Sequence, residues 1–86
     1  MLFERSERFK RAYRKLETAD RELVKKALRQ LAEDRNHPGL WLKGMQGTNG
    51  IWEIRAGHDI RITLEFVDEV TVLRNVGHHD ETLRQP

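Results

Sequence analysis

The sequence contains no cysteine and only two prolines, Pro38 and Pro86. The lack of cysteine excludes a disulfide framework, a thiolate metal site and a cysteine nucleophile, and a chain of 86 residues that folds without such cross-links is typical of the cytoplasm. No apolar run approaches the roughly 20 residues that span a bilayer, and the first residues lack the apolar core of a signal peptide. We therefore expect neither membrane insertion nor export.

A strong charge of either sign is also missing. Sixteen Lys and Arg residues oppose fourteen Asp and Glu residues, which leaves a net charge of +2. A hydrophobic content of 37% with 35% charged residues is typical of one globular domain over residues 1–86. The charge balance permits a nucleic-acid partner, and the local clustering of basic side chains decides whether one binds.

The first half of the sequence has helical periodicity. Apolar residues recur at spacings of three, four and seven in two segments that are two or three residues apart. In the first segment, which starts at Ser6, they are Phe9, Ala12, Tyr13 and Leu16. In the second segment, which Thr18 or Asp20 would cap and residues 36–39 would end, they are Leu23, Val24, Ala27, Leu28 and Leu31. So short a connection makes the two helices antiparallel neighbours.

After residue 39 the period changes to two, which indicates strands. Apolar and polar residues alternate over residues 52–56 and 60–66, and a third strand is expected over residues 70–76. Leu2 and Phe3 are expected to add an edge strand. The pattern predicts an α+β fold in which an N-terminal antiparallel helical hairpin packs on one face of a small twisted antiparallel sheet of three to four strands, in the order β-α-α-β-β-β.

The alternation also fixes the pairing of two strands. The apolar residues of both segments must face one side of the sheet, so the loop between them must have an odd number of residues, and residues 57–59 satisfy this. Arg55 then lies opposite Arg61. Like charges directly opposite each other are destabilising. Either the two guanidinium groups splay into water or pair with Glu53 and Glu65, or they are placed to bind an anion such as phosphate. An exposed Arg61 would be replaceable by alanine with little loss of stability.

Two registers are open for the third strand, because Leu73 and Arg74 lie on opposite faces and periodicity does not say which face is buried. A two-residue turn at Asp68 and Glu69 places Leu73 in the core beside Leu64. It also brings Arg74 to the exposed face with Arg61. This register is favoured because it does not bury an unpaired charge.

Three segments carry a resemblance to a known family: 42–45 (LKGM), 51–62 (IWEIRAGHDIRI) and 72–80 (VLRNVGHHD). With the two preceding helices, they resemble the RelE/ParE superfamily of toxins from type II toxin–antitoxin pairs. The RelE-like branch implies a ribosome-dependent mRNA endonuclease, which works without metal or other cofactor by driving the 2′-OH onto the adjacent phosphate. The resemblance also implies a cognate antitoxin, ribosome-bound mRNA as substrate, and a toxin–antitoxin hetero-oligomer.

The same resemblance assigns roles to residues. Arg61 matches an arginine that stabilises phosphate, Arg55 matches a basic position on the preceding strand, and His79 falls where some members place a catalytic histidine. We expect these three to be catalytic. The expected RNA contacts are Lys43, Arg74, His58 and His78. No metal site is expected, since adjacent histidines on an extended chain point to opposite sides.

One departure from the family leaves other functions open. Many RelE-like members carry a tyrosine where this chain has Leu83, so His79 would need a larger role in proton transfer. The alternatives are a ParE-like, non-enzymatic inhibitor of DNA gyrase and an inactive member that only binds its antitoxin. The four basic residues Arg55, Arg61, Arg74 and His79 favour the nuclease.

Overall fold

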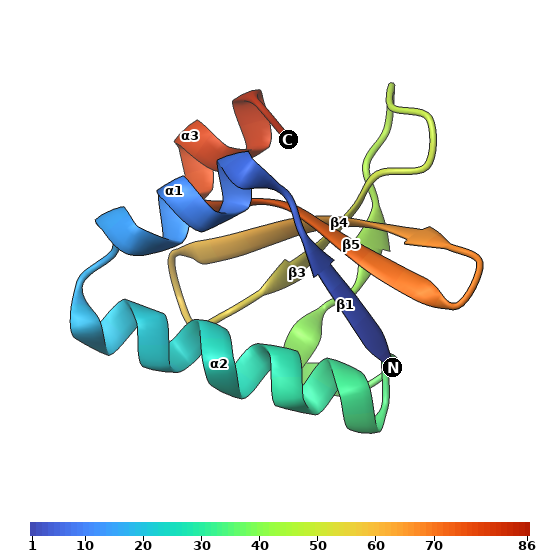
Figure 1. Cartoon of the computed structure of the whole chain (residues 1–86), viewed down its shortest axis with the longest axis horizontal. Coiled ribbons are helices and arrows are strands. Elements are labelled where there is room, and N and C mark those ends of the chain that lie inside the picture. Colours follow the sequence, from blue (N-terminus) through green and yellow to red (C-terminus); the bar gives the residue numbers. More distant parts are fainter.

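The computed structural model describes residues 1–86 and has an α+β fold, as predicted. Its helices are α1 (Glu7–Lys15), α2 (Thr18–Glu33), the 3₁₀ turn η1 (Pro38–Leu40) and α3 (His79–Arg84). Its strands are β1 (Leu2–Arg5), β2 (Lys43–Gly44), β3 (Trp52–Arg55), β4 (Ile60–Val67) and β5 (Val70–His78). They form one sheet in the order β1-β5-β4-β3-β2 (Figure 1).

The sheet differs from the expected one in two respects. The predicted edge strand forms, but β1 runs parallel to β5, whereas all other neighbours are antiparallel. The short strand β2 brings the total to five. In the sequence, α1 and α2 lie between β1 and the other strands. This long connection allows β1 to run parallel to β5, which a short hairpin loop would not. No helix is long and apolar enough to cross a bilayer.

The two N-terminal helices begin in different ways. Ser6 is the N-cap of α1, and its hydroxyl accepts a hydrogen bond from the Phe9 N–H at 3.0 Å. The expected cap of α2 is wrong: Thr18 is already helical, Glu17 occupies the N-cap position, and no side chain caps there. Arg21 instead donates to the Leu16 carbonyl and so fixes the corner between the helices.

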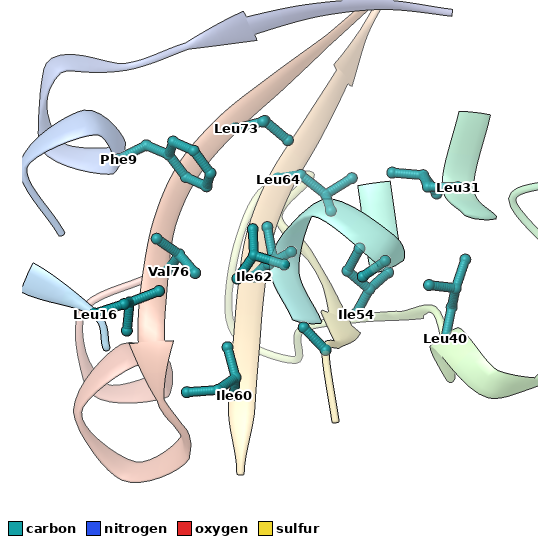
Figure 2. Packing of buried hydrophobic residues seen from close by; sticks show 13 residues of the cluster. Phe9, Leu16, Leu31, Leu40, Ile54, Ile60, Ile62, Leu64, Leu73 and Val76 are labelled. Carbon is teal, nitrogen blue, oxygen red and sulfur yellow. The ribbon is translucent and has the colours of Figure 1, made fainter. Parts of the chain in front are cut away.

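The core lies between the helices and one face of the sheet (Figure 2). In this view Phe9 and Leu16 gather around Val76 of β5, while Leu31 and Leu40 lie toward Ile54 and Leu64. Thirteen buried hydrophobic residues form this cluster. Each fully buried Leu or Ile contributes about 1.5–3 kcal/mol, so both helices depend on this face of the sheet.

The predicted pairing of β3 with β4 is confirmed. Ile54 pairs with Ile62, and Arg55 pairs with Arg61. The loop between them contains Gly57, whose φ of 91° is unfavourable for residues with a Cβ atom. A Cβ built on Gly57 would also lie 2.9 Å from Leu23 Cδ1, so the chain passes close to α2 at this point. Leu23 belongs to the predicted apolar stripe, but it covers this loop and remains 38% exposed.

The favoured register of β4 and β5 is also confirmed, with an irregularity that the sequence did not reveal. Leu64 pairs with Leu73, but Thr63 pairs with Asn75, so Arg74 is an extra residue in β5. This β-bulge lets both Leu73 and Val76 face the core, which strict alternation forbids. It is tied to the start of α1, because the Ser6 hydroxyl donates to the Arg74 carbonyl at 2.8 Å.

The C-terminal helix α3, which the sequence reading missed, packs on the opposite face of β4 and β5. Gly77 lies opposite Arg61 in the sheet, and a Cβ on Gly77 would lie 2.7 Å from Thr82 Oγ1. Two residues away from Arg61, the fully buried Thr63 donates its hydroxyl to Pro86 O at 2.9 Å. The C-terminal segment therefore covers the part of this outer face that adjoins Arg61.

Candidate functional site

Two arginines lie directly opposite each other on the outer face of the sheet. Arg55 is exposed, but Arg61 is only 5% exposed, so the prediction that both project into solvent is wrong for Arg61. The register of the hairpin places the two arginines opposite each other. The alternation that directs Ile54 and Ile62 to the core directs both arginines to the outer face. Two like charges are thus held together by the packing of the core.

The guanidinium of Arg61 is anchored by the backbone. Its Nη1 donates to the His58 carbonyl at 3.2 Å and to the Ile60 carbonyl at 3.0 Å. No carboxylate lies within 4.0 Å of it. Burial, and secondarily the charge of Arg55, lower the pKa of Arg61 below its ordinary value.

Two of the three nitrogens of the Arg61 guanidinium make no hydrogen bond within the protein. No buried side-chain nitrogen or oxygen in the protein lacks a hydrogen-bond partner. Nε and Nη2 of Arg61 make no hydrogen bond, so each retains some accessible surface, although the residue as a whole is only 5% exposed. A partly desolvated guanidinium with free donors, beside a second positive charge, is a good receptor for an anion such as phosphate.

Lys43 lies on β2 opposite Glu53, which is two residues before Arg55 on β3. The Nζ atom of Lys43 is 3.8 Å from Glu53 Oε1. Glu53 is itself 7% exposed, and its charge favours the ionised form of Arg61. Glu53 therefore offsets part of the positive charge, while the Lys43 side chain remains largely exposed.

Arg74 is on the outer face, as predicted, but it is not part of the arginine pair. It forms an ion pair with Glu65, and its Nε donates to Pro86 O at 3.2 Å. Glu65 is four residues beyond Arg61 on β4, which is about 13 Å along a strand. The Arg74 side chain, which we expected to contact RNA, is therefore engaged by partners within the protein.

The two adjacent histidines differ in their surroundings. His78 ends β5, and its Nδ1 is 2.6 Å from Asp59 Oδ2. This hydrogen bond raises the pKa of His78 above 6.5 and lowers the pKa of Asp59 below 3.8. His79 begins α3, and its Nδ1 is 2.9 Å from Asp80 Oδ1. The side chain of His58 is exposed, and only its carbonyl contacts Arg61.

A groove of about 580 Å³ lies between α1, β5 and α3, which are neighbours in Figure 1. Arg8, Arg11, Lys15 and His78 line it together with Glu17 and Glu81. Neither Arg55 nor Arg61 lines this groove, so the groove and the arginine pair are separate features. No three His, Asp or Glu side chains are grouped as metal ligands.

The sequence reading missed Trp41. It is 63% exposed, and the Arg55 guanidinium carbon lies 4.7 Å from the centroid of its ring. The residues on either side are apolar and packed, since Leu40 is fully buried and Leu42 packs against the core. Residues 40–42 have the sequence Leu-Trp-Leu. This pattern could have indicated that Trp41 faces outward while the two leucines face the core.

Comparison with known proteins gives matches only at the level of structure. No protein-family model matches the sequence. No curated protein matches it either. A chain of the RelB–RelE antitoxin–toxin complex from Methanococcus jannaschii is 19% identical, with a TM-score of 0.75 over 100% of this chain and 99% of that chain.

Two Escherichia coli structures are similar to the same extent. A chain of the RelBE toxin–antitoxin complex is 24% identical, with a TM-score of 0.70 over 90% of this chain and 94% of that chain. YafQ is 13% identical, with a TM-score of 0.79 over 93% of this chain and 94% of that chain. The chain therefore has the same fold as these RelE and YafQ structures, which confirms the fold that the resemblance of its motifs implied.

Proposed function

We propose that this protein is the toxin of a type II toxin–antitoxin pair, and that it cleaves mRNA on the ribosome. The observation that carries the proposal is the Arg55–Arg61 pair, in which two arginines lie opposite each other on neighbouring strands, the charge of Arg55 acts on Arg61, and Arg61 has no carboxylate partner. Placing two such charges together costs stability unless an anion binds between them. A phosphodiester is the anion whose oxygens match both guanidinium forks.

The proposed reaction needs no group from outside the RNA and the protein. The 2′-oxygen attacks the adjacent phosphorus and loses its proton, a 2′,3′-cyclic phosphate forms, and the 5′-oxygen leaves and takes up a proton. Arg61 and Arg55 stabilise the negative charge that builds up on the non-bridging oxygens. His79 exchanges a proton with one of the two reacting oxygens, and Lys43, His78 and His58 contact the RNA backbone.

The proposed partners follow from the same fold. Structures of similar chains include RelB–RelE antitoxin–toxin complexes from Methanococcus jannaschii and Pyrococcus horikoshii. We infer that an antitoxin binds this chain in the cytoplasm and forms a hetero-oligomer with it. The groove beside α1 and α3 carries a surplus of basic side chains and would suit an acidic segment of such a partner.

Expression of the chain alone, with primer extension on a host mRNA, tests the proposal. We expect growth arrest and cuts in phase with codons, and we expect purified protein to cleave ribosome-bound mRNA in the presence of EDTA. The double substitution of Arg55 and Arg61 by glutamine should abolish the cuts, whereas substitution of Arg29, an exposed arginine of α2, should not. Inhibition of gyrase supercoiling without RNA cleavage would instead support the ParE-like alternative.

A further inference from the structure

Trp41 is exposed although its neighbours are packed. With 63% of its surface accessible, it is the most exposed aromatic residue of the protein. Leu40 and Leu42 pack against the core on either side of Trp41, so the core fixes the position of the Trp41 backbone. A large aromatic side chain that a well-packed segment presents to solvent is more informative than an exposed residue on a loose loop.

The backbone of Trp41 is also unusual. Its φ of 52° and ψ of 45° are left-handed, a conformation that costs free energy in any residue with a Cβ atom. Gly or Asn would adopt it more readily. Such conformations concentrate at binding and catalytic sites, where the position of a side chain matters more than local stability.

Arg55 connects Trp41 to the phosphate site. The Arg55 guanidinium stacks on one face of the indole, and Arg55 pairs with Arg61 on the next strand. Trp41 and Arg61 are therefore both neighbours of Arg55, the first through its side chain and the second through the strand pairing. Arg55 covers one face of the ring, so the exposed surface includes the other face.

We propose that Trp41 is a stacking platform for a base of single-stranded RNA, placed so that an adjoining phosphate reaches Arg55 and Arg61. This rests on the proposed ribonuclease function and adds to it a site for the base beside the scissile linkage. Aromatic rings recognise unpaired bases by stacking, and this contact tolerates any base because every base has a π-face. The platform therefore binds the nucleotide, and the arginines bind its phosphate.

The test is direct binding of a fluorescently labelled 2′-O-methyl RNA trinucleotide, which cannot be cleaved by 2′-OH attack. We expect Trp41→Asn, which suits the left-handed backbone, and Trp41→Ala each to weaken binding about five- to a hundredfold. Trp41→Phe should retain most of the affinity. Phe3→Ala is the matched control, since Phe3 is a partly exposed aromatic residue on β1 at the opposite edge of the sheet.

A second set of RNAs separates stacking from a structural role. In each, one base is removed and the sugar and phosphate are kept. At one position, base removal should weaken binding to the wild-type protein as much as Trp41→Asn does, and it should cost nothing further in the variant. Unchanged affinity in both Trp41 variants, or equal effects of base removal in wild type and variant, would overturn the platform.

The two proposals fail in different ways. If the wild-type protein cleaves mRNA and the Trp41 variants bind RNA as it does, the platform alone is wrong. If the wild-type protein neither binds the trinucleotides nor cleaves ribosome-bound mRNA, the ribonuclease function is wrong and the platform falls with it.

Discussion

His78 Nδ1 and Asp59 Oδ2 lie 2.6 Å apart, between the end of β5 and the loop that precedes β4. Both side chains are 57% exposed. The backbone reinforces the pair, because the N–H of His79 donates to the Asp59 carbonyl at 2.8 Å. A carboxylate that holds one nitrogen of an imidazole fixes its orientation and favours its protonated form.

The first prediction concerns the titration of His78. Because its hydrogen bond to Asp59 raises the pKa above 6.5, we expect Asp59→Asn to lower the pKa of His78 toward that value. NMR titration of the imidazole protons measures this, with His78→Gln used to assign the signal. An unchanged midpoint in Asp59→Asn would show that the pair does not form in solution.

The same pair predicts a pH window of stability. The raised pKa of His78 gives stability that is complete below pH 6.5 and is lost as the pH rises through the folded-state pKa. The lowered pKa of Asp59 gives stability that is complete above pH 3.8 and is lost as the pH falls through its folded-state value. The difference in unfolding free energy between wild type and Asp59→Asn should therefore be largest between these two values. Urea denaturation across the pH range measures it, and a difference independent of pH would contradict the assignment.

The two arginines should separate function from stability. Arg55 is exposed, so Arg55→Ala should change the unfolding free energy by less than about 0.5 kcal/mol. Arg61→Ala removes a buried side chain and two hydrogen bonds to carbonyls, so it should cost about 1–3 kcal/mol. This replaces the expectation that Arg61 is dispensable for folding.

Cleavage assays complete this comparison. Both alanine variants should lose about 10²-fold or more in rate at a temperature where both are folded. Arg61→Lys keeps a positive charge without the guanidinium fork, so it should recover little of the rate. Full activity in Arg55→Ala would remove that residue from the phosphate site.

The parts of the fold that follow from alternation were predictable, and the parts that break it were not. The alternation of apolar and polar residues was enough to place Arg55 opposite Arg61. A shift of one residue in the register would have exposed the apolar side chains of one strand to solvent. The bulge at Arg74 was hidden, since it depends on the tie between Ser6 and β5. The burial of Arg61 was also hidden, because the covering helix α3 has only six residues and no apolar stripe.

Ser6 should be more important for stability than its size suggests. Its hydroxyl accepts from the Phe9 N–H and donates to the Arg74 carbonyl, so it both caps α1 and holds the bulge of β5. We expect Ser6→Ala to cost about 1–2 kcal/mol, which chemical denaturation measures. Thr18→Ala is the control, since the Thr18 hydroxyl caps no backbone N–H and makes only an exposed hydrogen bond with Arg21, and it should cost less than about 0.5 kcal/mol. Equal losses in both variants would mean that the Ser6 hydroxyl adds nothing special.

The last prediction concerns Gly77, which faces Arg61 across the sheet and lies under α3. A Cβ at this position would lie 2.7 Å from Thr82 Oγ1, and Thr82 is buried. Gly77→Ala must therefore displace the Thr82 hydroxyl, and because Thr82 is buried we expect α3 to shift with it. We expect a loss of about 1–3 kcal/mol in stability, and reduced cleavage because His79 begins the displaced helix.

Two further variants test whether the crowding with α3 is the cause. Gly44→Ala is the matched control, since its Cβ would meet nothing closer than 3.9 Å. In the double variant Gly77→Ala/Thr82→Ala the hydroxyl that crowds the new methyl group is absent, so the combined loss should be smaller than the sum of the two single losses. If the losses simply add, or if Gly44→Ala costs as much as Gly77→Ala, close packing of α3 on Gly77 does not explain the glycine, and a loss of cleavage in Gly77→Ala would not come from displacing His79 at the start of α3.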